Sequence, residues 1–285
     1  MPEHSFSKTA LGVAALRAAH QIIDDEPHIL EDPIAVRLFP AEALEQMRNE
    51  IARLREPGMV SLRTHVVLRS RYSEDRLEEA YRRGIRQFVV LGAGFDTFAY
   101  RQPDRARDLR IFEVDHPATQ RVKRERLDAA GISAPKNLEY VSIDFETTSL
   151  RDGLFASSFD PTQSAFVSCL GVLVYLTEEA VDAVFQLVAS FPPSSEIVFT
   201  FSPPAKATDA EQAARLAKMA ALVESLGEPW RTRLEPEVLT PKLRALGFSE
   251  VTFLSGEEAE ARYFRGRKDG LKASPRERIA SAIVG

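Results

Sequence analysis

Residues Val89–Tyr100 read VVLGAGFDTFAY, and this stretch decides the fold. An apolar run ends at Leu91, and a turn formed by Gly92, Ala93 and Gly94 follows it. Because glycine has no Cβ, such a turn can take tight backbone torsions and let a ligand approach closely. Open α/β sheets bind their ligands beside the carboxyl ends of the strands. We therefore predict that a strand ends at Leu91 and that the turn borders a ligand site.

Polar side chains follow the next two apolar runs. Asp115 comes 21 positions after Gly94 at the end of the second run, a spacing typical of a carboxylate that accepts hydrogen bonds from ribose hydroxyls. His116 comes next, and we expect it to border the same ligand rather than act as a base. Asp144 and Phe145 follow the third run, where an acid can accept from an adenine amino group and a ring can pack on the base. Together these residues predict a nucleoside-type ligand.

The residues of the turn also distinguish between two candidate cofactors that contain an adenosine. The dinucleotide fingerprint has a third glycine where this chain has Thr97, and it places a pyrophosphate at a helix N-terminus. Asp96 stands in that first turn, where its carboxylate would repel a pyrophosphate but can neighbour the cationic amino-acid end of S-adenosylmethionine. We therefore favour S-adenosylmethionine as the cofactor. A nicotinamide-dependent oxidoreductase on a similar fold is the alternative enzyme.

Apolar, β-branched runs alternate with helical patterns after the first eighty residues, which indicates an α/β fold with a doubly wound, mostly parallel sheet. One domain, residues 1–285, is predicted, with a helical cap over 1–84 and a core over 85–204 and 247–285. Residues 205–246 are predicted to be a helical insertion, which is either a lid near the substrate or extra packing. The predicted strands are Gln87–Leu91, Leu109–Val114, Leu138–Ser142, Ala165–Leu170, Glu196–Phe201 and Ser249–Leu254.

The cap is predicted from apolar residues that recur at helical spacing. They indicate helices over Thr9–Asp24, Ala41–Arg55 and Ser61–Arg83, and a short helix that starts at Asp32-Pro33. We expect Pro57-Gly58 to end the helix that precedes it.

Composition narrows the classes of partner. The net charge of −5 argues against nucleic acid, because duplex binding needs a concentrated basic field. No run reaches the roughly 18 apolar residues of a membrane-spanning helix, and the N-terminal apolar stretch lacks the features of a signal peptide, so we predict no membrane partner and a cytoplasmic location. The single cysteine, Cys169, excludes an internal disulfide, and no motif suggests a metal. The oligomeric state is not predicted.

Several segments, in order along nearly the whole chain, resemble the leucine carboxyl methyltransferase-like family, which includes bacterial O-methyltransferases of polyketide pathways. The resemblance implies a Rossmann-like class I methyltransferase fold and S-adenosylmethionine as cofactor. The matching segments are Thr9–Ala18 (TALGVAALRA), Asp32-Pro33, Arg69–Asp75 (RSRYSED), Gly84–Arg101 (GIRQFVVLGAGFDTFAYR), Phe112–Pro117 (FEVDHP), Asp144, Gly171–Leu176 (GVLVYL) and Tyr263–Leu271 (YFRGRKDGL).

The resemblance also implies cofactor contacts at matching positions. Arg69 resembles the arginine that pairs with the cofactor carboxylate, with Arg71 as a nearby competitor, and Arg17 resembles a second basic contact. Gly92, Asp115 and Asp144 match the family pattern. Many relatives have a glutamate that contacts the cofactor amino group where this chain has Leu170, so Asp96 or backbone carbonyls would serve the ammonium here.

The acceptor is less defined than the cofactor. We expect O-methylation of a carboxyl or hydroxyl group of a small molecule, such as a secondary metabolite. Tyr175 follows the fourth strand, where it either orients the acceptor as a catalytic residue or packs as an aromatic, and Arg101 and Arg63 are candidate anchors for an anionic acceptor. The alternative that is not an enzyme, motivated by Leu170, is a protein that binds S-adenosylmethionine without transferring its methyl group.

Overall fold

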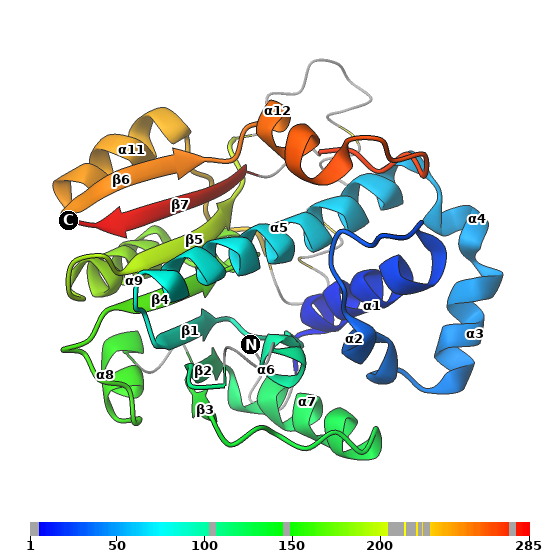
Figure 1. The fold of residues 1–285 in the computed structure, drawn as a ribbon, viewed down its shortest axis with the longest axis horizontal. Coiled ribbons are helices and arrows are strands. Elements are labelled where there is room, and N and C mark those ends of the chain that lie inside the picture. Colours follow the sequence, from blue (N-terminus) through cyan, green and yellow to red (C-terminus); the bar gives the residue numbers. More distant parts are fainter. Residues whose placement is uncertain are drawn as a thin grey trace.

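The computed structural model describes residues 6–102, 107–144, 149–204, 214, 221, 224, 229–273 and 278–285. Its centre is a seven-stranded sheet with the strand order β3-β2-β1-β4-β5-β7-β6 (Figure 1). Neighbouring strands from β1 to β5 run parallel, and β7 lies antiparallel between β5 and β6. This confirms the predicted doubly wound, mostly parallel α/β sheet. The strands are β1 (Gln87–Leu91), β2 (Arg110–Asp115), β3 (Leu138–Ser142), β4 (Ala165–Cys169), β5 (Glu196–Phe201), β6 (Phe248–Phe253) and β7 (Arg278–Val284).

The strand prediction was wrong at one place and shifted at others. It omitted β7, whose sequence RIASAIV mixes small and polar residues with its apolar ones. The second strand ends at Asp115 rather than Val114, and the fourth ends at Cys169 rather than Leu170. As a result Asp115 is the last residue of a strand, while Leu170 begins the segment that leaves the sheet.

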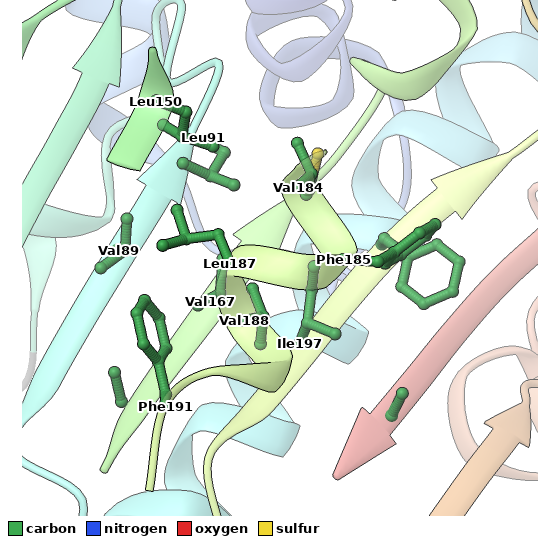
Figure 2. Packing of buried hydrophobic residues seen from close by; sticks show 14 of the residues in the cluster. Val89, Leu91, Leu150, Val167, Val184, Phe185, Leu187, Val188, Phe191 and Ile197 are labelled. Carbon is green, nitrogen blue, oxygen red and sulfur yellow. The ribbon is translucent and has the colours of Figure 1, made fainter. Parts of the chain in front are cut away.

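Helices cover both faces of the sheet. Side chains that alternate along each strand form two buried clusters, because successive residues of a strand point to opposite faces. Figure 2 shows one cluster, in which Val184, Phe185 and Val188 of α9 (Glu178–Ala189) pack on Val167 and Ile197. The same cluster receives side chains from α8 (Leu150–Phe155) and α11 (Pro236–Ala245).

The opposite face is covered mainly by α5 (Pro57–Arg82), the long helix that crosses the sheet in Figure 1. Its C-terminal half is anchored at the start of β5, where the fully buried Glu196 accepts from Arg76 Nε at 2.7 Å and from Arg83 Nη2 at 2.5 Å. Residue 69 lies seven positions earlier, or roughly 10 Å along the helix at 1.5 Å per residue. Because strands β1, β4 and β5 are parallel, this displacement carries Arg69 toward their carboxyl ends.

The remaining elements surround this core. Beyond the carboxyl ends of the parallel strands lie α1 (Lys8–Ile23), α2 (Pro33–Arg37), α3 (Ala41–Asn49) and α4 (Ile51–Leu54) (Figure 1). Connections and the C-terminal region contain α6 (Phe98–Arg101), α7 (Pro117–Ala129), the short 3₁₀ helix η2 (Leu173–Tyr175), α12 (Gly256–Ala259) and the π-helical turn η3 (Glu260–Phe264). Among the described helices, none combines the length and apolar character that a membrane crossing requires.

The cap helices follow the prediction with two corrections. Ala41–Arg55 forms two helices rather than one, because the chain is non-helical at Glu50. Pro57 opens α5 instead of ending the preceding helix, since proline is well accommodated in a first helical turn. Of the predicted insertion 205–246, residues 205–228 lie outside the described residues apart from 214, 221 and 224, while α11 buries Leu239 and Leu243 in the cluster of Figure 2.

Candidate functional site

The turn after β1 is held in place by its neighbours. Gly92 N and Ala93 N both donate to Val114 O, at 2.9 and 3.1 Å, which ties the turn to β2. Gly92 has φ +65°, and a Cβ built on it would lie 2.3 Å from Val172 Cγ2, while a Cβ at Gly94 (φ +51°) would lie 3.0 Å from Ala10 Cβ. Both glycines are therefore required by torsion and by the close approach of two other segments, namely α1 and the segment after β4.

Asp115 lies beside this turn with its carboxylate already oriented. Its Oδ2 accepts from Gly94 N at 2.5 Å and its Oδ1 accepts from His116 N at 2.6 Å. Burial raises the pKa of Asp115, although the two amide hydrogen bonds act in the opposite direction. Each carboxylate oxygen has a further lone pair, so the group can also accept from a vicinal diol.

His116 connects the ends of β2 and β3. Its Nδ1 accepts from Ala118 N at 3.2 Å and caps α7, which assigns the ring proton to Nε2. Nε2 lies 3.9 Å from Asp144 Oδ2, just beyond the end of β3. Asp115, His116 and Asp144 are thus brought together as the spacing predicted. Phe145, the predicted base-packing ring, lies outside the described residues.

Arg69 reaches the carboxyl end of β4 from α5. Its side chain is buried, and its guanidinium covers Gly171: a Cβ built there would lie 2.6 Å from Nη1 and 2.8 Å from Nη2. The competitor Arg71 has a side chain that is 45% exposed and pairs with Asp75 at 2.9 Å. The structure thus places Arg69, and not Arg71, at the sheet edge that carries the turn. Gly171 was not singled out from the sequence, although a glycine directly after a strand was the available signal.

A buried polar network joins the turn to the N-terminal helices. Arg17, on α1, donates to Phe95 O and lies 3.2 Å from Asp32 Oδ2 and 3.7 Å from Asp96 Oδ2. Asp32 Oδ1 accepts from Thr97 Oγ1 at 2.8 Å. Arg17 therefore holds the turn through a carbonyl and two carboxylates. The sequence indicated Asp32 only as the start of a helix, and its contact with the turn spans 65 positions.

The two arginines expected to anchor an acceptor have internal partners instead. Arg101 forms two hydrogen bonds with the carboxylate of Glu74, and Arg63 donates from Nε and Nη2 to Asp24, both at 2.7 Å. Both guanidinium groups thus bind carboxylates of the protein itself, and their role as acceptor anchors stays a prediction.

The remaining candidates lie near the same edge. Leu170 packs against the α5-side cluster. Asp96 accepts a hydrogen bond at 2.8 Å from the backbone N–H of Phe98, the first residue of α6, and its side chain is 19% exposed. Tyr175 ends η2, where Val174 O accepts from Arg231 N at 2.8 Å. This hydrogen bond holds the segment Pro229–Leu234 beside the segment that follows β4.

The arrangement fits an adenosine linked to an amino acid. The turn follows β1, Asp115 ends β2 and Asp144 lies just beyond β3, while Gly171 and Arg69 lie at the end of β4, on the other side of β1. This is the point where the strand order reverses, at which open α/β sheets bind ligands. A carboxylate of the protein can accept hydrogen bonds from both hydroxyls of a ribose, and a guanidinium can donate two hydrogen bonds to the carboxylate of an amino acid. The described residues contain no group of three or more side chains able to hold a metal ion.

Known proteins resemble this chain over most of its length. A family model described as leucine carboxyl methyltransferase matches residues 10–189. The relative named S-adenosyl-L-methionine-dependent methyltransferase YktD, from Bacillus subtilis (strain 168), is 31% identical over 294 residues, which cover 96% of each chain. A protein named for the same activity, from Mycobacterium avium (strain 104), is 34% identical over 74% of this chain and 71% of its own.

Solved structures share the fold at low sequence identity. A protein named as a methyltransferase, from Thermobifida fusca YX, has a TM-score of 0.56 at 17% identity and covers 95% of this chain and 94% of its own. A DUF574 family protein from Streptomyces avermitilis has a TM-score of 0.54 at 20% identity, over 95% of this chain and 97% of its own. With this fold, the sequence match and the strand-end site, the chain belongs to the leucine carboxyl methyltransferase family of S-adenosylmethionine-dependent methyltransferases.

Proposed function

We propose that this methyltransferase acts on oxygen and that its acceptor is the carboxyl group of a small molecule, such as a secondary metabolite. The supporting observation is the composition of the two segments beside the end of β4. Leu170–Thr177 and Pro229–Leu234 contain no histidine and no carboxylate, and they contact each other through Val174. A carboxylate acceptor is already ionised at neutral pH and needs no base, whereas a hydroxyl acceptor does. This contrast favours a carboxyl group over a hydroxyl group.

The residues of the site have distinct roles in this proposal. Asp115 accepts from the ribose hydroxyls and Asp144 from the adenine amino group, while the guanidinium of Arg69 binds the carboxylate of the cofactor. S-Adenosylmethionine, when bound, supplies a methyl group on a cationic sulfur. Tyr175, which follows β4, donates a hydrogen bond that orients the acceptor. Positioning and exclusion of water are the main contributions of the protein, because alignment alone can lower a barrier of this kind substantially.

A transfer assay tests the proposal. The protein is incubated with methyl-labelled S-adenosylmethionine and matched pairs of acceptors, each an acid and the corresponding alcohol or phenol. We expect labelled methyl esters from the acids, hydrolysable by mild base, and a several-fold lower rate for Tyr175→Phe. Base-stable ethers formed from the phenols would instead indicate a hydroxyl acceptor. If no S-adenosylhomocysteine formed with any acceptor, despite cofactor binding, the protein would be one that binds the cofactor without transferring its methyl group.

A further inference from the structure

Two buried polar side chains of α7 face the strand that carries Asp115. Lys123 Nζ donates to Glu113 Oε2 at 2.5 Å, and each of these side chains is 1% exposed. Glu113 precedes Asp115 by two positions on β2, so both side chains point to the same face of the sheet. A buried ion pair is a poor source of stability, because removing both charges from water costs as much as their attraction returns. Its presence here therefore calls for another role.

More negative than positive groups act on this ion pair and on Asp115. The carboxylates of Asp96 and Asp115 both act on Glu113, and the ammonium of Lys123 acts on both Glu113 and Asp115. Among the described residues, Glu113 Oε1 has no hydrogen-bond partner. Three carboxylates, those of Asp96, Glu113 and Asp115, thus interact around Lys123.

Two tyrosines and a histidine also face this interior. Tyr100 of α6 and Tyr140 of β3 are hydrogen-bonded through their hydroxyls, and burial raises the pKa of both phenols, so both stay neutral. His116, at the start of α7, also acts on Asp115. Lys123 lies 5.5 Å from the centre of the Tyr100 ring, which adds a cation–π contact.

The same helix face fixes the ends of both neighbouring strands. Gln120 Nε2 donates to Glu113 O at 2.9 Å and to Val141 O at 3.1 Å, and its Oε1 accepts from Ser142 Oγ at 2.6 Å. Gln120 and Lys123 lie on one side of α7, since residues three apart are neighbours on a helix. The inner face of α7 therefore links β2 and β3 immediately before their ligand-facing ends.

We propose that Lys123 is a positioning residue for the cofactor, because its buried ammonium, held by Glu113, keeps Asp115 ionised for the ribose hydroxyls. This inference rests on the proposed role of Asp115. Burial raises the pKa of Glu113 to about 7 and also raises that of Asp115, whereas the ammonium of Lys123 lowers both. Once Glu113 is protonated it carries no negative charge, so the positive charge of Lys123 acts on the carboxylate of Asp115 only. Cofactor binding is thereby maintained into mildly acidic solution.

Calorimetric titration with S-adenosylhomocysteine at pH 5.5, 7.0 and 8.5 tests the inference. We expect Lys123→Met to weaken binding, most strongly at pH 5.5 and least at pH 8.5. A pKa of Asp115 one unit above the pH of the assay would reduce the ionised fraction, and hence the affinity, by about tenfold. The matched control is Arg121→Met, which removes an exposed cation from the same helix and leaves the affinity unchanged at each pH.

A double variant separates positioning from folding. Glu113→Leu with Lys123→Met replaces the pair by apolar side chains, a change that buried pairs commonly tolerate. We expect this variant to fold, by near-ultraviolet circular dichroism, and to lose affinity with the same pH dependence as Lys123→Met. Wild-type affinity in the folded double variant would overturn the inference.

The failure of the proposed function is distinguishable in the same titration. If the wild-type protein itself did not bind S-adenosylhomocysteine, or if Asp115→Asn bound it as well as the wild type, the assignment of the site would be wrong. If the wild type bound, Asp115→Asn did not, and Lys123→Met behaved as the wild type, only the role of Lys123 would be wrong.

Discussion

Gly92→Ala is the most informative single substitution, because two separate effects oppose an added methyl group at this position. The residue has φ +65°, a torsion that L-residues adopt at a cost of about 1–2 kcal/mol. The new Cβ would also lie 2.3 Å from Val172 Cγ2, so one of the two segments must move. Valine is stiff about χ1 and cannot simply rotate away, and overpacking of this kind costs about 1–3 kcal/mol. We expect a total loss of about 2–5 kcal/mol in the free energy of unfolding.

Gly131→Ala is the matched control for this substitution. Gly131 has φ +66°, and a Cβ built there would meet nothing within 4 Å, so this variant loses only the torsional part, about 1–2 kcal/mol. Urea denaturation measures both losses. Truncating Val172 to alanine in the Gly92→Ala protein removes both Cγ atoms and leaves Val172 Cβ at 3.4 Å, so we expect a coupling of about 1–3 kcal/mol between the two changes.

The same variants report on the ligand site. We expect Gly92→Ala to weaken binding of S-adenosylhomocysteine because the turn must shift, while Gly131→Ala leaves binding unchanged. Equal losses of stability for Gly92→Ala and Gly131→Ala, with additive effects of the Val172 truncation, would refute the reasoning that close approach fixes this turn.

Three other predictions concern single side chains. Arg69→Ala is expected to weaken the binding of S-adenosylhomocysteine by more than about tenfold in calorimetry, because it removes a buried charge-assisted hydrogen bond. Arg71→Ala is the control variant, and we expect it to bind with unchanged affinity. Arg63→Met is expected to lower the free energy of unfolding by about 3–5 kcal/mol at pH 7, because it leaves the buried carboxylate of Asp24 without its bidentate partner. Burial alone raises the pKa of Asp24, but the hydrogen bonds of its carboxylate outweigh burial and lower the pKa below the ordinary value of 3.8. The stability that ionised Asp24 contributes is therefore present above that value and is lost as the pH falls through the pKa of the folded state. Urea titrations of the wild type that showed no such loss of stability in acid would contradict this expectation. Burial raises the pKa of Cys169 to about 12, so we expect no reaction with a thiol reagent at pH 8 until urea unfolds the chain, and rapid labelling of the native protein would show that the thiol is accessible.

The sequence predicted the parallel part of the fold because apolar, β-branched runs and turn residues are local signals. The prediction failed where one residue type occurs in two different structural contexts. Pro57 can end one helix or open the next, and the structure uses it to open α5. The strand Arg278–Val284 was missed because Ala280, Ser281 and Ala282 are small residues that carry little strand signal, although all three are buried between two other strands.

The candidate site divides in a similar way. Asp115 and Asp144 were predicted because strand ends in a parallel sheet meet at one edge, so spacing along the chain is sufficient. The contacts of Asp32 with Thr97, and of Arg69 with Gly171, join segments far apart in sequence and depend on how α1 and α5 pack. No local pattern specifies such packing, so Asp32 was assigned only its capping role and Arg69 was identified by family resemblance.

We infer that S-adenosylmethionine binds at the carboxyl ends of β1 to β4, between Asp115 and Arg69. A crystal structure of the protein with S-adenosylhomocysteine would locate the ligand relative to both residues. We expect both ribose hydroxyls to lie within hydrogen-bond distance of the Asp115 carboxylate, and the carboxylate of the ligand to lie on the Arg69 guanidinium. A ligand whose ribose contacts neither Asp115 nor the turn Gly92–Gly94, or whose carboxylate lies away from Arg69, would contradict this inference.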